Sequence, residues 1–216
     1  MTFSLVLPLV RACLAVPLLS AGVQAEPSKS LTAELPSPAV QLGQADRQLQ
    51  KLLARRPPSW SPEADMNRSE LLRIVESMLD AEELARRALG ERWETLPASE
   101  RARFVSLLSA VTVKSYTGVL MRNPGLQTEF LTAHGDRDDM RVTAVRTIGS
   151  GEHAQRIPVE YRLCWKGERW RVYDMVVGGV SAVEEYRAQF NKILARESFA
   201  GLMDRMRHKL RDAPRP

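Results

Sequence analysis

Apolar residues in the first half of the chain recur at steps of three and four, which is the spacing of an amphipathic helix. The first strong run of this kind covers residues 69–89. Within it, residues 80–83 (Asp-Ala-Glu-Glu) resemble a capping box with Asp in place of Ser or Thr, and Gly90 is a natural stop. A longer run follows Pro97 and ends at residues 123–125, Asn-Pro-Gly. The pattern therefore predicts a helical segment before any strand.

The period then changes to two, which is typical of strands with one apolar and one polar face. Residues 157–165 alternate most strictly between apolar and mainly polar side chains, and residues 140–148 repeat the pattern more weakly. Turn signals lie at residues 149–152 and 166–168. The spacing predicts an antiparallel sheet of about four strands. The expected strands are residues 126–132, 140–148, 157–165 and 170–176.

The helical period returns after the glycine pair at residues 178–179. Residues 181–184 (Ser-Ala-Val-Glu) form a capping box before a helix that reaches Leu194, and Ser198 can cap a last helix. A sheet with one apolar face must be covered, and the helices are the available cover. The chain is therefore predicted to be an α+β protein with its sheet covered by helices.

The first 25 residues have the pattern of a secretory signal peptide. The apolar stretch at residues 12–21 is too short to span a bilayer. Residues 23–25 (Val-Gln-Ala) place small side chains at the −3 and −1 positions of a cleavage site. We expect export to the periplasm and a mature protein that begins at Glu26. An uncleaved anchor and lipidation of Cys13 are the alternatives.

The remaining sequence divides into two parts. Residues 26–65 are rich in proline and are predicted to form an N-terminal arm that packs loosely, with one helix in the proline-free stretch 39–56. Residues 66–216 are predicted to form the globular domain. The sequence shows no internal repeat.

Composition and charge exclude several classes of protein. The chain has 216 residues, of which 44% are hydrophobic and 26% charged, so it is not collagen-like, disordered or disulfide-dense. Its pI of about 9.5 is compatible with a nucleic-acid partner. However, charges of both signs are mixed along each predicted helix and no recognition motif is present, so no nucleic acid is expected. Cys164 is the one cysteine beyond the predicted signal peptide, which excludes an internal disulfide.

The sequence contains no common catalytic or metal-binding motif. The three histidines, at positions 134, 153 and 208, are widely spaced, and the acidic residues at 136, 138 and 139 read as a solvated turn. Asp174 lies among apolar residues of its strand, and we interpret it as a structural carboxylate bonded to backbone or to an arginine. We therefore predict no catalytic residues, no metal and no cofactor.

Three stretches together resemble the MlaC family. The first is residues 170–183 (WRVYDMVVGGVSAV) followed by 186–190 (YRAQF). The others are residues 80–90 (DAEELARRALG) with Trp93, and residues 100–104 (ERARF). Members of this family, also called toluene-tolerance proteins, are periplasmic phospholipid-binding shuttles, and some relatives occur with hopanoid pathways. The resemblance covers roughly residues 69–210, in the expected order.

The resemblance implies a curved, helix-covered sheet, NTF2-like in part, with an apolar lipid pocket between its layers. It further implies a bound phospholipid as cargo and two docking partners, an inner-membrane ABC transporter complex and an outer-membrane lipoprotein complex. The expected role is maintenance of outer-membrane lipid asymmetry. The candidate lipid-binding residues are Phe104, Leu108, Val142, Val159, Tyr161, Leu163, Val172 and Phe190.

Other functions remain open at this point. Each candidate residue can instead belong to a dry core. A carrier for hopanoids or other lipids, an NTF2-like enzyme and an adaptor that binds only proteins are the alternatives. An enzyme would need polar groups inside the sheet, where Tyr161 and Asp174 are the candidates.

Overall fold

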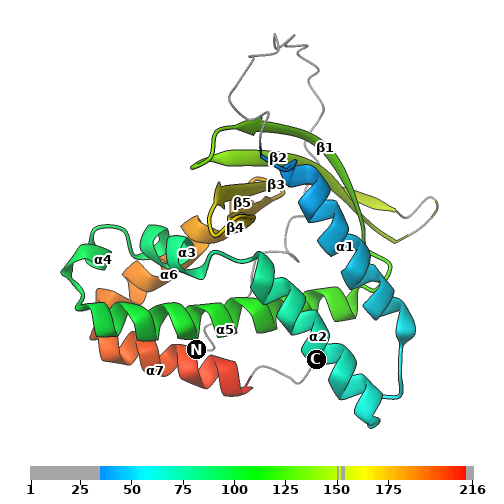
Figure 1. Ribbon diagram of the computed structural model, residues 1–216. Coiled ribbons are helices and arrows are strands. Elements are labelled where there is room, and N and C mark those ends of the chain that lie inside the picture. Colours follow the sequence, from blue (N-terminus) through cyan, green and yellow to red (C-terminus); the bar gives the residue numbers. More distant parts are fainter. Residues whose placement is uncertain (1–34, 150, 152–153, 213–216) are drawn as a thin grey trace.

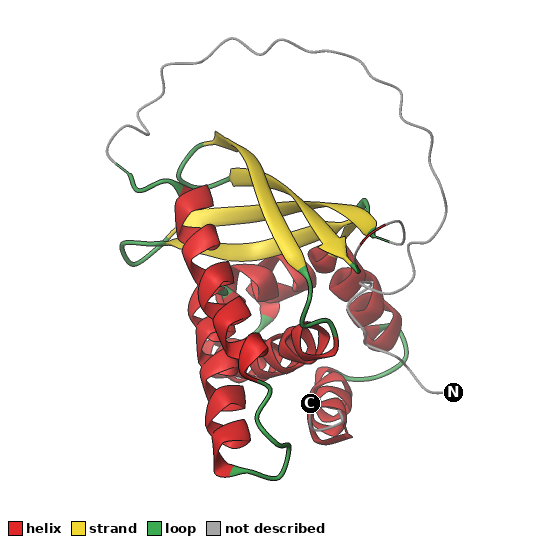
Figure 2. Ribbon diagram, turned by 90° about the vertical axis from the view of Figure 1, so that its right-hand side faces the viewer, coloured by secondary structure: helices red, strands yellow, loops and turns green. Residues whose placement is uncertain are grey.

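The computed structural model describes residues 35–149, 151 and 154–212. A sheet lies over a layer of helices, as Figures 1 and 2 show from two sides. Within these residues, the helices before the sheet are Pro38–Arg55 (α1), Pro62–Met78 (α2), Ala81–Leu89 (α3), Arg92–Thr95 (α4) and Ala98–Arg122 (α5). The strands are Gln127–Gly135 (β1), Met140–Ile148 (β2), Gln155–Trp165 (β3), Trp170–Val177 (β4) and Val180–Ser181 (β5), followed by Ala182–Leu194 (α6) and Phe199–Asp212 (α7). The predicted α+β class is confirmed.

In the described part of the chain, the sheet is antiparallel with its strands in sequence order, β1-β2-β3-β4-β5. The short β5 adds to the four strands predicted. Val142 of β2 pairs with Tyr161 of β3, and paired side chains share a face, so the apolar sets of these strands lie together. Register shifts occur at residues 130–132 and 162–163. Such shifts bend and twist strands, which turns the apolar face toward the helices.

Side-chain caps start three of the helices at the predicted positions. The Asp80 carboxylate accepts the backbone N–H of Glu83 at 3.0 Å at the start of α3. The Ser181 hydroxyl accepts the N–H of Glu184 at 3.2 Å at the start of α6. The Ser198 hydroxyl, one residue before α7, accepts the N–H of Gly201 at 3.2 Å. Each cap satisfies a backbone donor that the first helical turn leaves unpaired.

The helix α2 begins earlier than the apolar spacing predicts. It starts at Pro62 instead of near Ser69, with the Ser61 hydroxyl accepting the N–H of Ala64 at 3.2 Å. Proline is favoured at the first helical position, where its missing N–H costs nothing. The first two turns contribute exposed or half-buried side chains, so they show no apolar periodicity.

The helix α1 packs closely against the sheet and α2, contrary to the loose packing predicted for the arm. Leu42, Leu49, Leu52 and Leu53 are all buried. The Gln41 amide bonds the backbone of Trp170 in both directions, donating to its carbonyl at 2.7 Å and accepting from its N–H at 3.0 Å. The predicted arm therefore contributes a structural helix to the globular fold.

The central helix α5 is long and apolar enough to cross a membrane by length and composition alone. In the structure it packs against α2, α3 and α7, and Figure 1 shows it running between them. Its residues Phe104 and Leu108 are fully buried, and the Phe104 ring meets Phe190 of α6 edge to face at 5.5 Å. This contact lies in the core cluster formed by α3, α5, α6 and α7.

Candidate functional site

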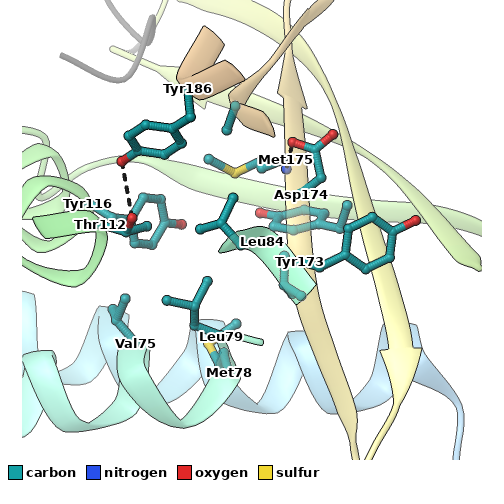
Figure 3. Close-up of a pocket in the computed structure, with 13 residues that line it drawn as sticks. Val75, Met78, Leu79, Leu84, Thr112, Tyr116, Tyr173, Asp174, Met175 and Tyr186 are labelled. Carbon is teal, nitrogen blue, oxygen red and sulfur yellow. Dashed lines mark hydrogen bonds between the residues drawn. The ribbon is translucent and has the colours of Figure 1, made fainter. Parts of the chain in front are cut away.

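A cavity opens between the sheet and the helices, with an empty volume of about 600 Å³ including its mouth. This volume counts the open solvent at the mouth. Binding sites for small molecules have mostly apolar walls, and Figure 3 shows side chains from both layers around this cavity. The apolar part of the wall consists of Val75, Met78, Leu79, Leu84, Val172, Met175 and Ala182.

The junction of α2 and α3 forms one side of this pocket. Leu79 makes a single bridge to Val172, and the N–H of Asp80 donates to the Val172 carbonyl at 2.8 Å. These bonds hold the segment against β4. Because Leu79 and Leu84 lie on either side of this link, the apolar wall continues from the helices onto the strand.

Four tyrosines are among the residues that line the pocket. The hydroxyls of Tyr186 and Thr112 lie 3.0 Å apart and form a hydrogen bond, drawn as a dashed line in Figure 3. Burial raises the pKa of Tyr186, so its hydroxyl stays neutral. Tyr116, Tyr161 and Tyr173 line other parts of the wall.

Asp174, which also lines the pocket, has the structural role predicted for it. Its buried carboxylate accepts the hydroxyl of Ser181 at 2.7 Å and the N–H groups of Met175 and Val183 at 2.8 and 3.0 Å. It also forms an ion pair with Arg162 at 3.2 Å. Four donors saturate the carboxylate, so it holds β4 to the start of α6.

Arg146 lies directly behind two tyrosines of the pocket wall. It is 2% exposed, and one of its terminal nitrogens, Nη2, donates to the hydroxyl of Tyr161 at 2.8 Å and to that of Tyr116. Burial alone lowers the pKa of Arg146, but the two tyrosine oxygens raise it, and the net shift is upward. Burial raises the pKa of Tyr161, although Arg146 opposes this. Arg146 thus keeps its charge, and Tyr161 keeps its proton.

Two of the eight predicted residues, Tyr161 and Val172, line the pocket. Three others lie in the core cluster under the sheet, into which Leu42 of α1 also packs. The last three lie between the helices. The residues in the sheet core are Val142, Val159 and Leu163, and those between the helices are Phe104, Leu108 and Phe190.

The sequence interpretation missed the helical side of the pocket and Arg146. Nothing in the apolar periodicity separates Val75 or Tyr116 from other inward residues of their helices. Arg146 did leave a signal, because it continues the inward register of Met140, Val142 and Ala144 in β2. A charge at such a position marks a buried polar site.

Cys164 has the environment of an unreactive thiol. Its Sγ donates to a carboxylate oxygen of Asp80 at 3.3 Å, and burial together with this carboxylate raises the pKa of Cys164 to about 12. Thiolates, not thiols, are the nucleophiles. Among the residues that the structure describes, no three His, Cys, Asp or Glu side chains are grouped to hold a metal ion.

A meandering sheet over helices, with an apolar pocket between the layers, defines a small α+β protein of the ligand-binding type. Residues 44–208 match the family described as MlaC protein, and the chain belongs to this family. Its fold is similar to that of the phospholipid-binding protein from Ralstonia solanacearum, solved in complex with a phospholipid. The two are 16% identical, the TM-score is 0.63, and the match covers 82% of this chain and 98% of that one. No curated protein matches.

Proposed function

We propose that the protein is a periplasmic carrier that holds the acyl chains of a phospholipid in the pocket between the sheet and α2, α3, α5 and α6. The observation that carries this proposal is the apolar wall of the cavity between the two layers. Membership of the MlaC family and the phospholipid complex of the Ralstonia protein support it.

The energetics suit a carrier that must both load and unload. Each methylene removed from water gains about 0.8 kcal/mol, so two long acyl chains would gain about 25 kcal/mol. That exceeds the upper limit of non-covalent affinity, about 21 kcal/mol, and cannot be a net binding energy. The donor is a membrane in which the chains are already dry. Transfer from bilayer to pocket is then nearly balanced, and the headgroup stays in water at the mouth.

The proposal includes the cellular setting. The predicted signal peptide at residues 1–25 lies outside the described residues, and it supports a periplasmic location. There, the carrier would exchange phospholipid with an inner-membrane ABC transporter complex and an outer-membrane lipoprotein complex. This traffic would maintain the lipid asymmetry of the outer membrane.

Lipid extraction tests the proposal. The exported protein, purified without detergent, is denatured in organic solvent and the extract is analysed by mass spectrometry. We expect intact two-chain phospholipid in amounts close to one per protein. An empty protein that takes up no lipid from liposomes would be an adaptor, hydrolysed lipid would indicate an enzyme, and a triterpenoid would indicate a hopanoid carrier.

A further inference from the structure

Arg146 is a buried cation with too few partners. Its Nε and Nη1 atoms are buried and have no hydrogen-bond partner, and only Nη2 is bonded. No carboxylate forms an ion pair with it among the residues described. Asp46 is close enough to interact electrostatically, but it already accepts from Thr128, and burial raises the pKa of Asp46.

Such an arrangement is costly for folding. A buried guanidinium is stable when its N–H groups are bonded and its charge is paired, and an apolar side chain of similar length often serves the core as well. Buried polar groups in native proteins are nearly always satisfied, and an unsatisfied one calls for a partner that the folded chain itself does not supply. The place of Arg146 in the fold indicates where that partner binds.

The two tyrosines connect Arg146 to the pocket. Tyr116 and Tyr161 both line the pocket, and their hydroxyl oxygens accept the Nη2 protons. Each hydroxyl therefore keeps its own proton to donate, and no acceptor for either proton is found in the described part of the chain. Tyr161 is 5% exposed and Tyr116 is half-buried. The two hydroxyls therefore lie between the pocket wall and a buried positive charge.

We propose that this end of the pocket binds the carboxylate of a single-chain fatty acid. Tyr116 and Tyr161 donate their hydroxyl protons to it, and Arg146 behind them supplies the compensating charge. The acyl chain then lies along the apolar wall formed by residues such as Leu79 and Met175. This inference rests on the proposed function in that it uses the same pocket, and it adds a second class of cargo, bound with its polar end inward.

The charge and the shape of the site favour a carboxylate over a phosphate. A carboxylate carries one negative charge and balances one guanidinium, whereas a phosphate monoester carries about 1.5 to 2 and would leave buried charge unpaired. The phosphodiester of a two-chain phospholipid bears a single charge. However, it is substituted on both sides, so it is not a terminal anionic group as a carboxylate is.

Calorimetric titration of the lipid-free protein with two ligands of equal chain length tests the proposal. Dodecanoic acid carries the carboxylate, and dodecan-1-ol is its neutral match. We expect the acid to bind about 10- to 100-fold more tightly than the alcohol, as hydrogen bonds to a charged group imply. In Arg146→Met and in the Tyr116→Phe/Tyr161→Phe double variant, the ratio of the two affinities should fall to about one. Circular dichroism checks that each variant is folded.

The outcomes separate this proposal from the carrier function. Equal affinity for acid and alcohol in the unmodified protein, or a preference that survives in folded Arg146→Met, overturns the fatty-acid site even if phospholipid is extracted from the purified protein. If Arg146→Met does not fold, the double tyrosine variant decides in the same way. Displacement of the acid by inorganic phosphate at equal concentration would assign the site to phosphate and overturn the carboxylate.

Discussion

Asp174 shows how one buried residue fixes the relation between two elements. Its carboxylate lies in β4 and bonds the hydroxyl of Ser181 and the N–H of Val183, which begin α6. The side chain of Asp174 is 1% exposed, so these donors and Arg162, rather than bulk water, satisfy its oxygens. Because Asp174 also lines the pocket, the same bonds set the position of the pocket wall.

Replacing Asp174 by alanine should lower the free energy of unfolding by about 3 kcal/mol, since buried donors and a guanidinium lose their acceptor. Asp174→Asn keeps one acceptor oxygen and should lose less. Asp204→Ala is the matched control, because Asp204 forms an exposed pair with Arg207 that contributes little. Urea denaturation followed by circular dichroism measures all three. If Asp174→Ala were as mild as the control, the carboxylate would not have this structural role.

At the scale of elements, the sequence pattern predicted those features that depend on residues close in sequence. The alternation at residues 157–165 and the caps at Asp80 and Ser181 depend on neighbours in sequence, and the structure confirms them. The packing of α1 depends on contacts with Trp170, which is 129 positions from Gln41, and no local pattern contains that information. Only tertiary placement decides which apolar residues border a cavity.

The same reason explains the partial success at the candidate site. Val159 and Tyr161 have equal apolar register on β3 and both belong to the sheet core, yet only Tyr161 of the two also lines the pocket. Tyr116 of α5 lines the pocket together with Tyr161, and the two hydroxyls share the guanidinium of Arg146. The sequence identified the inward face of the strand, and the helices determine which part of that face stays open.

Removing the bonds of Gln41 should loosen α1 selectively. In Gln41→Ala the N–H and carbonyl of Trp170 lose their side-chain partner, with an expected loss of about 1 to 3 kcal/mol. Amide hydrogen exchange should accelerate in α1 while α6 keeps its protection. Gln44→Ala on the exposed side of the same helix is the control. Equal exchange in the two variants would show that α1 is held by its leucines alone.

At the scale of the whole molecule, the two layers leave an apolar space where they meet. The sheet supplies one wall from β3 and β4, and α2, α3, α5 and α6 supply the other. A lipid chain in this space replaces contacts with a bilayer by contacts with side chains, so little net free energy is needed for transfer. This balance is what the proposed carrier function requires, because a carrier must both load and unload its lipid.

The most direct test of this account measures the transfer of fluorescent phospholipid from donor to acceptor liposomes. It uses a variant in which a larger side chain fills the pocket. Met175 lines the cavity, so Met175→Trp should occupy the space of the acyl chains and reduce the transfer rate at least about 10-fold in a folded protein. Val40→Trp adds the same side chain at a position of α1 that is 56% exposed, and it should transfer lipid like the unmodified protein. Equal transfer rates for Met175→Trp and Val40→Trp would contradict the assignment of the lipid to this pocket.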